Sequence, residues 1–112
     1  GSSNLITPSY AAGTLTVPAG GAGTYRVNCQ FGWSGTASKA WVFYLYKNTD
    51  TQFAEAVSAT GGAGIPSQYV TAFGGCIALA AADVVSLYVK STDGGTSFTM
   101  AYGELFMERI GA

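Results

Sequence analysis

The sequence contains no histidine and few charged side chains. Its 112 residues include five lysines and arginines and six aspartates and glutamates, which gives a net charge of −1. Charged residues make up 10%, against roughly 25% in an average globular protein. A catalytic serine or cysteine needs a base beside it, which is usually histidine. Because the sequence has no histidine, it contains no Ser–His or Cys–His pair, and catalysis by such a pair is excluded. The scarcity of charge predicts that other copies of the chain cover part of the surface.

Other features are also missing. No apolar run approaches the ~18 residues of a membrane-spanning helix, so membrane insertion is not expected. The five cations form no basic cluster, which argues against nucleic acid binding. They are Arg26, Lys39, Lys47, Lys90 and Arg109. Two cysteines are too few for a disulfide scaffold, and two thiols alone do not make a metal site, so no metal or cofactor is expected.

The carboxylates do not suggest a catalytic pair. Glu104 and Glu108 flank an apolar strand, whereas Asp50, Asp83 and Asp93 fall in turns. We expect Asp83 to accept hydrogen bonds from backbone amides at its turn. Paired carboxylates serve glycosidases, but this placement favours structural roles. The sequence therefore predicts a protein that is not an enzyme.

The sequence does contain a series of short apolar strands separated by Gly, Ala and Pro. The clearest is Tyr25–Trp33, where every second residue is apolar. Apolar residues on both faces of Trp41–Tyr46 predict a strand that is central or lies in an interface. Further strands are expected at 15–17, 52–60, 69–79, 84–90 and 98–110, with a β-bulge at Gly74–Gly75. This succession predicts a sandwich or a barrel.

The length is that of one domain, because 112 residues are too few to bury a second core. Residues 1–3 are typical of an expression-tag remnant. Residues 4–112 are expected to form a single head domain, with a short edge segment at Thr7–Tyr10.

Four short motifs follow one another along the chain. They are Val17-Pro18 with Gly23–Val27, Leu45–Asn48, Cys76–Val85 and Tyr102–Phe106. In this order they resemble the vP…GxYxF, L-(F/Y)-K-N, LxLxxGDxV and FSGfLl stretches of the complement globular-head (C-one-q) and tumour necrosis factor family. Ala82 stands where that family usually has glycine. The resemblance extends from Leu15 to Phe106, which is 92 of the 112 residues.

The resemblance implies an all-β, two-sheet antiparallel jelly-roll sandwich, assembled as a homotrimer on a stalk. One sheet of each sandwich would pack round the three-fold axis. The lean composition is similar to that of heads at bacteriophage tail-fibre tips and on bacterial collagen-like filaments, which implies a location on the virion surface or outside the cell. The acidic cluster that binds calcium in some relatives has no match here.

The aromatic residues divide into core and interface. Those predicted in the core are Tyr25, Phe31, Phe43, Phe98 and Phe106. Those predicted at the trimer interface, where a large ring with a polar tip is favoured, are Trp41, Tyr44, Tyr46, Tyr88 and Tyr102. Cys29 is expected to be a buried thiol. In the resembled fold its strand neighbours that of Cys76, so a disulfide is possible, although Cys76 is expected to point outward.

Every second connection is expected at the end of the sandwich distal to the stalk. These are Ser34–Lys39, Gly61–Gln68 and Ser91–Ser97, which are longer and more polar than Ala19–Gly23, Lys47–Thr51 and Ala80–Asp83. Binding residues are expected there. The predicted ligand contacts are Trp33, Lys39, Gln68, Tyr69, Asp93 and Thr96. Trp33 would either stack on a sugar ring or close the end of the sandwich.

Together these features predict a trimeric receptor-binding head that recognises a cell-surface glycan or protein. Three copies of a weak site would act together through multivalency. The alternative is a structural trimerisation cap that registers a fibre and binds no ligand.

Overall fold

The computed structural model describes residues 14–62 and 68–111, which form seven β-strands. They are β1 (Thr14–Thr16), β2 (Gly23–Gly35), β3 (Ala40–Lys47), β4 (Thr51–Ala59), β5 (Tyr69–Leu79), β6 (Val84–Ser91) and β7 (Phe98–Gly111). Each strand predicted from residue 15 onward is present. The expression-tag remnant at 1–3 and the edge segment Thr7–Tyr10 lie outside the described residues. Those residues include no helix long and apolar enough to cross a membrane.

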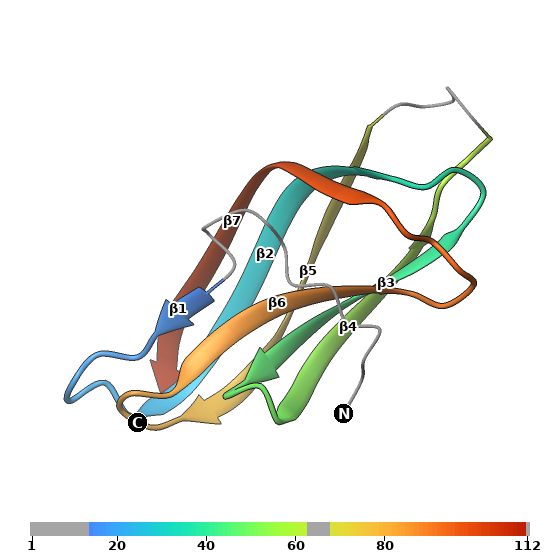
Figure 1. Ribbon diagram of the computed structural model, residues 1–112. Helices are drawn as coiled ribbons and strands as arrows, with labels where there is room; N and C mark the ends of the chain where they lie inside the picture. Colours follow the sequence, from blue (N-terminus) through green and yellow to red (C-terminus); the bar gives the residue numbers. More distant parts are fainter. Residues whose placement is uncertain (1–13, 63–67, 112) are drawn as a thin grey trace.

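The strands form two sheets that face each other across a hydrophobic core (Figure 1). Sheet A has the strand order β1-β6-β3-β4, and sheet B has the order β5-β2-β7. All pairings between neighbouring strands are antiparallel. Every connection except the β3–β4 hairpin passes from one sheet to the other. The prediction of an all-β fold with two antiparallel sheets is therefore confirmed.

Strand β2 supplies much of the core from sheet B. Its alternate residues Tyr25, Val27, Cys29, Phe31 and Trp33 are all buried. Of the residues between them, Arg26, Asn28 and Gln30 are exposed on the outer face of the sheet, whereas Gly32 is buried. This is the period of two that the sequence shows, because successive side chains of a strand point to opposite faces.

Strand β3 lies between β6 and β4, which confirms that it is central in its sheet. Trp41, Phe43 and Leu45 are fully buried against sheet B. Tyr44 and Tyr46 lie on the outer face of sheet A, where neighbouring tyrosines cover part of their surface. The apolar character of both faces of β3 therefore has two sources, a core on one side and an aromatic cluster on the other.

The bulge expected at Gly74–Gly75 is absent. Strand β5 pairs with β2 in one unbroken register, with Gly74 opposite Asn28 and Gly75 opposite Val27. Register shifts occur elsewhere. One extra residue interrupts β7 at Ala101 and again at Ile110, and β4 has an extra residue at Phe53. Each extra residue inverts which side chains face the core beyond it.

The connections 17–22, 48–50 and 80–83 lie at one end of the sandwich, which we call the turn end. The carboxylate of Asp83 accepts hydrogen bonds there from the backbone N–H of Ala80 and the side-chain amide of Asn48, both at 2.8 Å. Asn48 Oδ1 accepts the N–H of Val84 at 2.8 Å. These hydrogen bonds, with that from Ala80 the strongest influence, hold the pKa of Asp83 below its ordinary value. The prediction that Asp83 accepts backbone hydrogen bonds at its turn is confirmed for one amide, the N–H of Ala80.

This carboxylate predicts a pH dependence of stability. Because the pKa of Asp83 is lower in the folded state than in the unfolded state, its stabilising effect is present at neutral pH. It is lost as the pH falls below about 4, where the unfolded state takes up the proton first. Denaturant midpoints measured from pH 7 to pH 2 should fall more steeply for the natural chain than for Asp83→Asn. Equal slopes for the two proteins would contradict this role of Asp83.

Candidate functional site

The three longer connections meet at the other end of the sandwich, which we call the loop end (Figure 1). Its described residues are 36–39, 60–62, 68 and 92–97. The N–H of Thr36 donates to the carbonyl of Ser97 at 2.9 Å, and the N–H of Ser38 donates to that of Gly61 at 2.8 Å. The expectation that these connections lie together is confirmed, although part of the Gly61–Gln68 connection lies outside the described residues.

Two threonine hydroxyls tie the connections to one another. Thr36 Oγ1 accepts the N–H groups of Thr96 and Ser97 at 3.1 and 3.0 Å. Thr60 Oγ1 accepts the N–H of Lys39 at 2.9 Å and donates to the carbonyl of Thr36 at 2.6 Å. These hydrogen bonds hold the three connections against one another at the loop end.

Asp93 and Thr96, both predicted ligand contacts, have structural roles at the loop end. Asp93 Oδ1 accepts the N–H of Ala40 at 2.9 Å and the hydroxyl of Ser91 at 3.3 Å. Thr96 contributes the backbone hydrogen bond to Thr36, while its side chain is exposed. Of the other predicted contacts, Gln68 is exposed and Lys39 is half-buried. These four residues are thus brought to one end of the molecule.

Trp33 lies in the core, with an exposed fraction of 0%. Its Nε1–H donates to Thr71 Oγ1 at 2.9 Å, and its ring stacks on Tyr69 and Phe98 at centroid distances of 4.9 and 5.7 Å. Tyr69 is half-buried, and its hydroxyl accepts the N–H of Gly61 at 2.6 Å. A fully buried ring offers no face to a sugar. Of the two roles considered for Trp33, the structure supports closing the end of the sandwich.

The five aromatic residues predicted at a trimer interface lie in three separate places. Trp41 is fully buried in the core, so it has no surface with which to contact another subunit. Tyr44, Tyr46 and Tyr88 form a cluster on the outer face of sheet A, with ring centroids 6.1 and 5.4 Å apart. Tyr102 lies on the outer face of sheet B, opposite Gly32. No single surface holds all five.

The outer surface of sheet B carries apolar residues that sequence reasoning assigned elsewhere or missed. The exposed large side chains on β5 and β7 are Val70 (62% exposed), Tyr102 (44%), Phe106 (51%) and Ile110 (46%). The neighbouring outward positions of β5 include the small residues Ala72, Gly74 and Ala78. Phe106, predicted in the core, is thus on the outside, because the extra residue Ala101 inverts the alternation along β7. The outer surface of sheet B therefore combines apolar and small side chains on β5 and β7 with polar side chains on β2.

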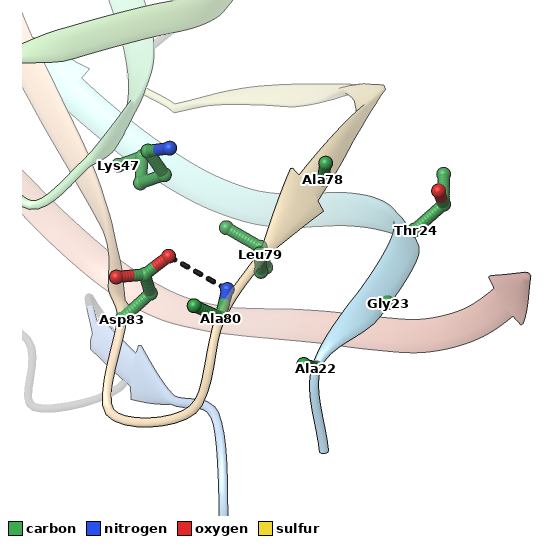
Figure 2. A pocket seen from close by; sticks show the side chains of 8 residues that line it. All are labelled: Ala22, Gly23, Thr24, Lys47, Ala78, Leu79, Ala80 and Asp83. Carbon is green, nitrogen blue, oxygen red and sulfur yellow. Dashed lines mark hydrogen bonds between the residues drawn. The ribbon is translucent and has the colours of Figure 1, made fainter. Parts of the chain in front are cut away.

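The described part of the chain includes two shallow hollows of similar size. The first, of about 330 Å³, is at the turn end, where Figure 2 shows Lys47 facing an apolar wall that includes Leu79 and Ala80. The Asp83 carboxylate at its edge already accepts the Ala80 N–H, as the dashed line shows. The second, of about 360 Å³, lies on the outer surface of sheet B beside Phe106. In residues 14–62 and 68–111, no three His, Cys, Asp or Glu side chains lie close enough to hold a metal ion.

Cys29 and Cys76 are both free thiols. Cys29 is buried on the inner face of β2, whereas Cys76 is exposed on the outer face of β5, opposite Arg26. Side chains on opposite faces of adjacent strands do not meet the geometry of a disulfide. Burial raises the pKa of the Cys29 thiol to about 12, so this group stays protonated at neutral pH.

This difference predicts that one thiol of the folded chain reacts quickly and the other slowly. A thiolate is the reactive species, and Cys76 is accessible whereas Cys29 is not. Maleimide labelling of the monomeric chain at pH 7, followed by mass spectrometry, should give a single adduct on Cys76. An assembly that covers the outer face of β5 should slow this reaction. Labelling in denaturant should give two adducts. The Cys76→Ser variant should remain unlabelled until it unfolds, and rapid labelling of this variant in buffer would contradict the burial of Cys29.

Comparison of the sequence with models of known protein families found no match, and neither did comparison with curated protein sequences. The case for a function therefore depends on the fold, the two outer surfaces and the loop end.

Proposed function

We propose that this chain is the head domain of a homotrimeric fibre protein, in which a non-catalytic jelly roll binds a cell-surface glycan or protein at its loop end. The strand order is the observation that carries the proposal. Two sheets ordered β1-β6-β3-β4 and β5-β2-β7, with every connection but one crossing between them, fit a jelly roll better than a meander. This order supports the family resemblance of the four motifs and, with it, a fibre tip such as that of a phage tail.

The outer surface of sheet B is the proposed trimer interface. It carries Tyr102 and Phe106, together with a row of small residues that permits close approach. One ion pair, Arg26 to Glu108 at 3.3 Å, crosses from β2 to β7 on this surface. Exposed apolar area of this kind favours burial against other subunits, and aromatic residues are enriched in such interfaces. Of the five predicted interface residues, Tyr102 is the one that lies here.

The loop end is the proposed receptor-binding surface. Strand β7 finishes at the turn end, where its last residue, Gly111, pairs with Thr24. The loop end is therefore at the opposite end of the sandwich from this terminus of the sheet. Loops displayed on a rigid sandwich are where binding residues concentrate. Three copies in a trimer would present three such loop ends on one particle, and weak sites would then act together.

Sedimentation of matched variants tests the assembly. The natural chain should sediment as a trimer at micromolar concentration. Phe106→Asp should shift it toward the monomer, because it places a charge in the proposed interface. Val57→Asp is the control, since Val57 is similarly exposed but lies on β4 in sheet A, and this variant should remain a trimer. A monomeric natural chain would overturn the proposal.

Binding experiments distinguish the hypothesis of a receptor-binding head from that of a structural cap without a ligand. A glycan array probed with the trimer, and adsorption of the trimer to candidate host cells, should both give saturable binding. Substitutions on the loop end, such as Lys39→Ala and Gln68→Ala, should weaken it, whereas Thr16→Ala at the turn-end side of β1 should not. A trimer that binds no glycan and no cell would support the cap instead.

A further inference from the structure

The indole N–H of Trp41 is buried without a hydrogen-bond partner, and it is the single such side-chain group found in the described part of the chain. The other indole N–H, of Trp33, has an acceptor in Thr71 Oγ1 at 2.9 Å. A donor that is removed from water and left unpaired costs free energy. An acceptor that reached Trp41 Nε1 would recover this cost.

The unpaired edge of Trp41 lies under two glycines, Gly35 at the end of β2 and Gly95 of the loop end. A Cβ atom placed on Gly35 would lie 2.9 Å from Cζ2 and 3.0 Å from Cε2 of Trp41, and one placed on Gly95 would lie 2.7 Å from Cζ2. Cε2 is bonded to Nε1, so the same edge of the ring carries the N–H. Both glycines are partly exposed. Bare backbone is therefore what separates this donor from the surface of the loop end.

This cover is held by hydrogen bonds to hydroxyl groups. The N–H of Gly95 donates to Ser91 Oγ at 2.8 Å, and the N–H groups of Thr96 and Ser97 donate to Thr36 Oγ1. Gly94, the preceding residue, has a φ of +94°, a conformation that suits glycine. Gly94 and Gly95 lie between β6 and β7, so their displacement breaks no hydrogen bond of a sheet ladder. A ligand hydroxyl can then take the place of a side-chain hydroxyl in these contacts.

We infer that the loop end binds a neutral carbohydrate, with a sugar oxygen accepting the hydrogen bond from Trp41 Nε1 as Gly94–Gly95 move aside. A sugar hydroxyl accepts one hydrogen bond and donates another, so it also satisfies Ser91 Oγ once Gly95 has moved. Among the described residues of the loop end, Lys39 and Asp93 carry charge, one of each sign, so no net charge there selects an ionic ligand. The inference rests on the proposed function for the location of binding, and it adds the chemical class of the ligand and a specific donor.

Indole resonances of a tryptophan-labelled sample test this directly. The chain has two tryptophans, whose ¹⁵N–¹H cross-peaks are assigned with Trp33→Phe and Trp41→Phe. The probes are glucose, galactose, mannose and N-acetylglucosamine, each titrated to saturation or to its solubility limit. At least one should move the Trp41 cross-peak while leaving that of Trp33 in place. Trp41→Phe should weaken binding of that sugar by roughly tenfold, and Trp33→Phe should not.

The inference is overturned if no sugar moves the Trp41 cross-peak, or if Trp41→Phe binds the sugar as tightly as the natural chain does. Thermal melts of both variants establish that each is folded under the conditions used. Sedimentation of the same samples separates this result from the assembly. A monomer with a shifted Trp41 cross-peak would reject the trimer and support the sugar site. A trimer without the shift would reject the sugar site alone.

Discussion

Replacement of Trp33 by alanine is expected to destabilise the folded chain by about 3–5 kcal/mol, the range for removing a buried aromatic ring. Trp33 is fully buried and contacts four other rings. Those rings are Trp41, Phe43, Tyr69 and Phe98, at centroid distances of 4.9 to 6.2 Å. They come from both sheets, so the cavity left by the substitution would lie where the two layers are joined. A domain of this size has a total stability of about 5–15 kcal/mol, and this loss removes a large part of it.

Chemical denaturation of the natural chain, Trp33→Ala and Trp33→Phe tests this expectation. Trp33→Phe keeps an aromatic ring in the cluster and loses the indole N–H, so its cost should be much smaller. Thr71→Val is a matched probe of the same hydrogen bond, because it removes the acceptor and leaves a buried donor unpaired, at about 1–3 kcal/mol. Combined in a double-mutant cycle, Trp33→Phe and Thr71→Val should cost less than their sum. A Trp33→Ala variant as stable as the natural chain would mean that Trp33 is not in the core.

Much of the fold follows from the spacing of apolar residues. The alternation from Tyr25 to Trp33 predicts both β2 and the face that it buries. The apolar residues on both faces of Trp41–Tyr46 predict a central strand, and β3 is one. The alternation of connections along the chain predicts which of them share an end. These predictions succeed because burial at a period of two is set locally along each strand.

The predictions that were wrong concern features that depend on how one strand pairs with another. Phe98 and Phe106 are separated by an even number of residues, so regular alternation places both in the core. The extra residue Ala101 breaks that relation, and Phe106 emerges on the outer surface of sheet B. Nothing in the residues around Ala101 marks this bulge, because it is fixed by pairing with β2. Of the large side chains on this surface, the sequence therefore placed Tyr102 at the interface and missed Phe106.

Trp33 and Trp41 illustrate a second limit. Trp33 ends a strand beside a polar connection, which favoured ligand binding, and the polar tip of the large Trp41 ring favoured subunit contact. In the structure the connections fold over them, and Gly35 and Gly95 lie against Trp41 where any larger residue would collide. The burial of a residue at a strand end depends on how neighbouring connections cross it, and that crossing is a property of the whole sandwich. The glycines are the signal in the sequence, because backbone packs closely on a ring where side chains are absent.

Replacement of Gly74 by alanine is expected to destabilise the chain by about 1–3 kcal/mol, the usual cost of an added group that forces a backbone shift. A Cβ atom at this position would collide with the carbonyl oxygen of Val27 and with the side chain of Asn28. The Val27 carbonyl belongs to the backbone of β2, so the collision is relieved by distorting the β2–β5 pairing. Denaturant midpoints of Gly74→Ala and Gly62→Ala should therefore differ clearly. Gly62 has open space around the corresponding position and serves as the control.

This comparison also decides between two registers of β5. Sequence reasoning placed a bulge at Gly74–Gly75, where an added methyl group would point into a locally widened ladder and be tolerated. In the structure Gly74 is paired directly with Asn28, and the two strands approach so closely that the methyl group has no room. A Gly74→Ala variant as stable as Gly62→Ala would favour the bulge and shift the outward row of β5. Ala72 and Ala78 belong to that row. Such a result would therefore change which side chains of β5 lie on the surface proposed to join the three subunits.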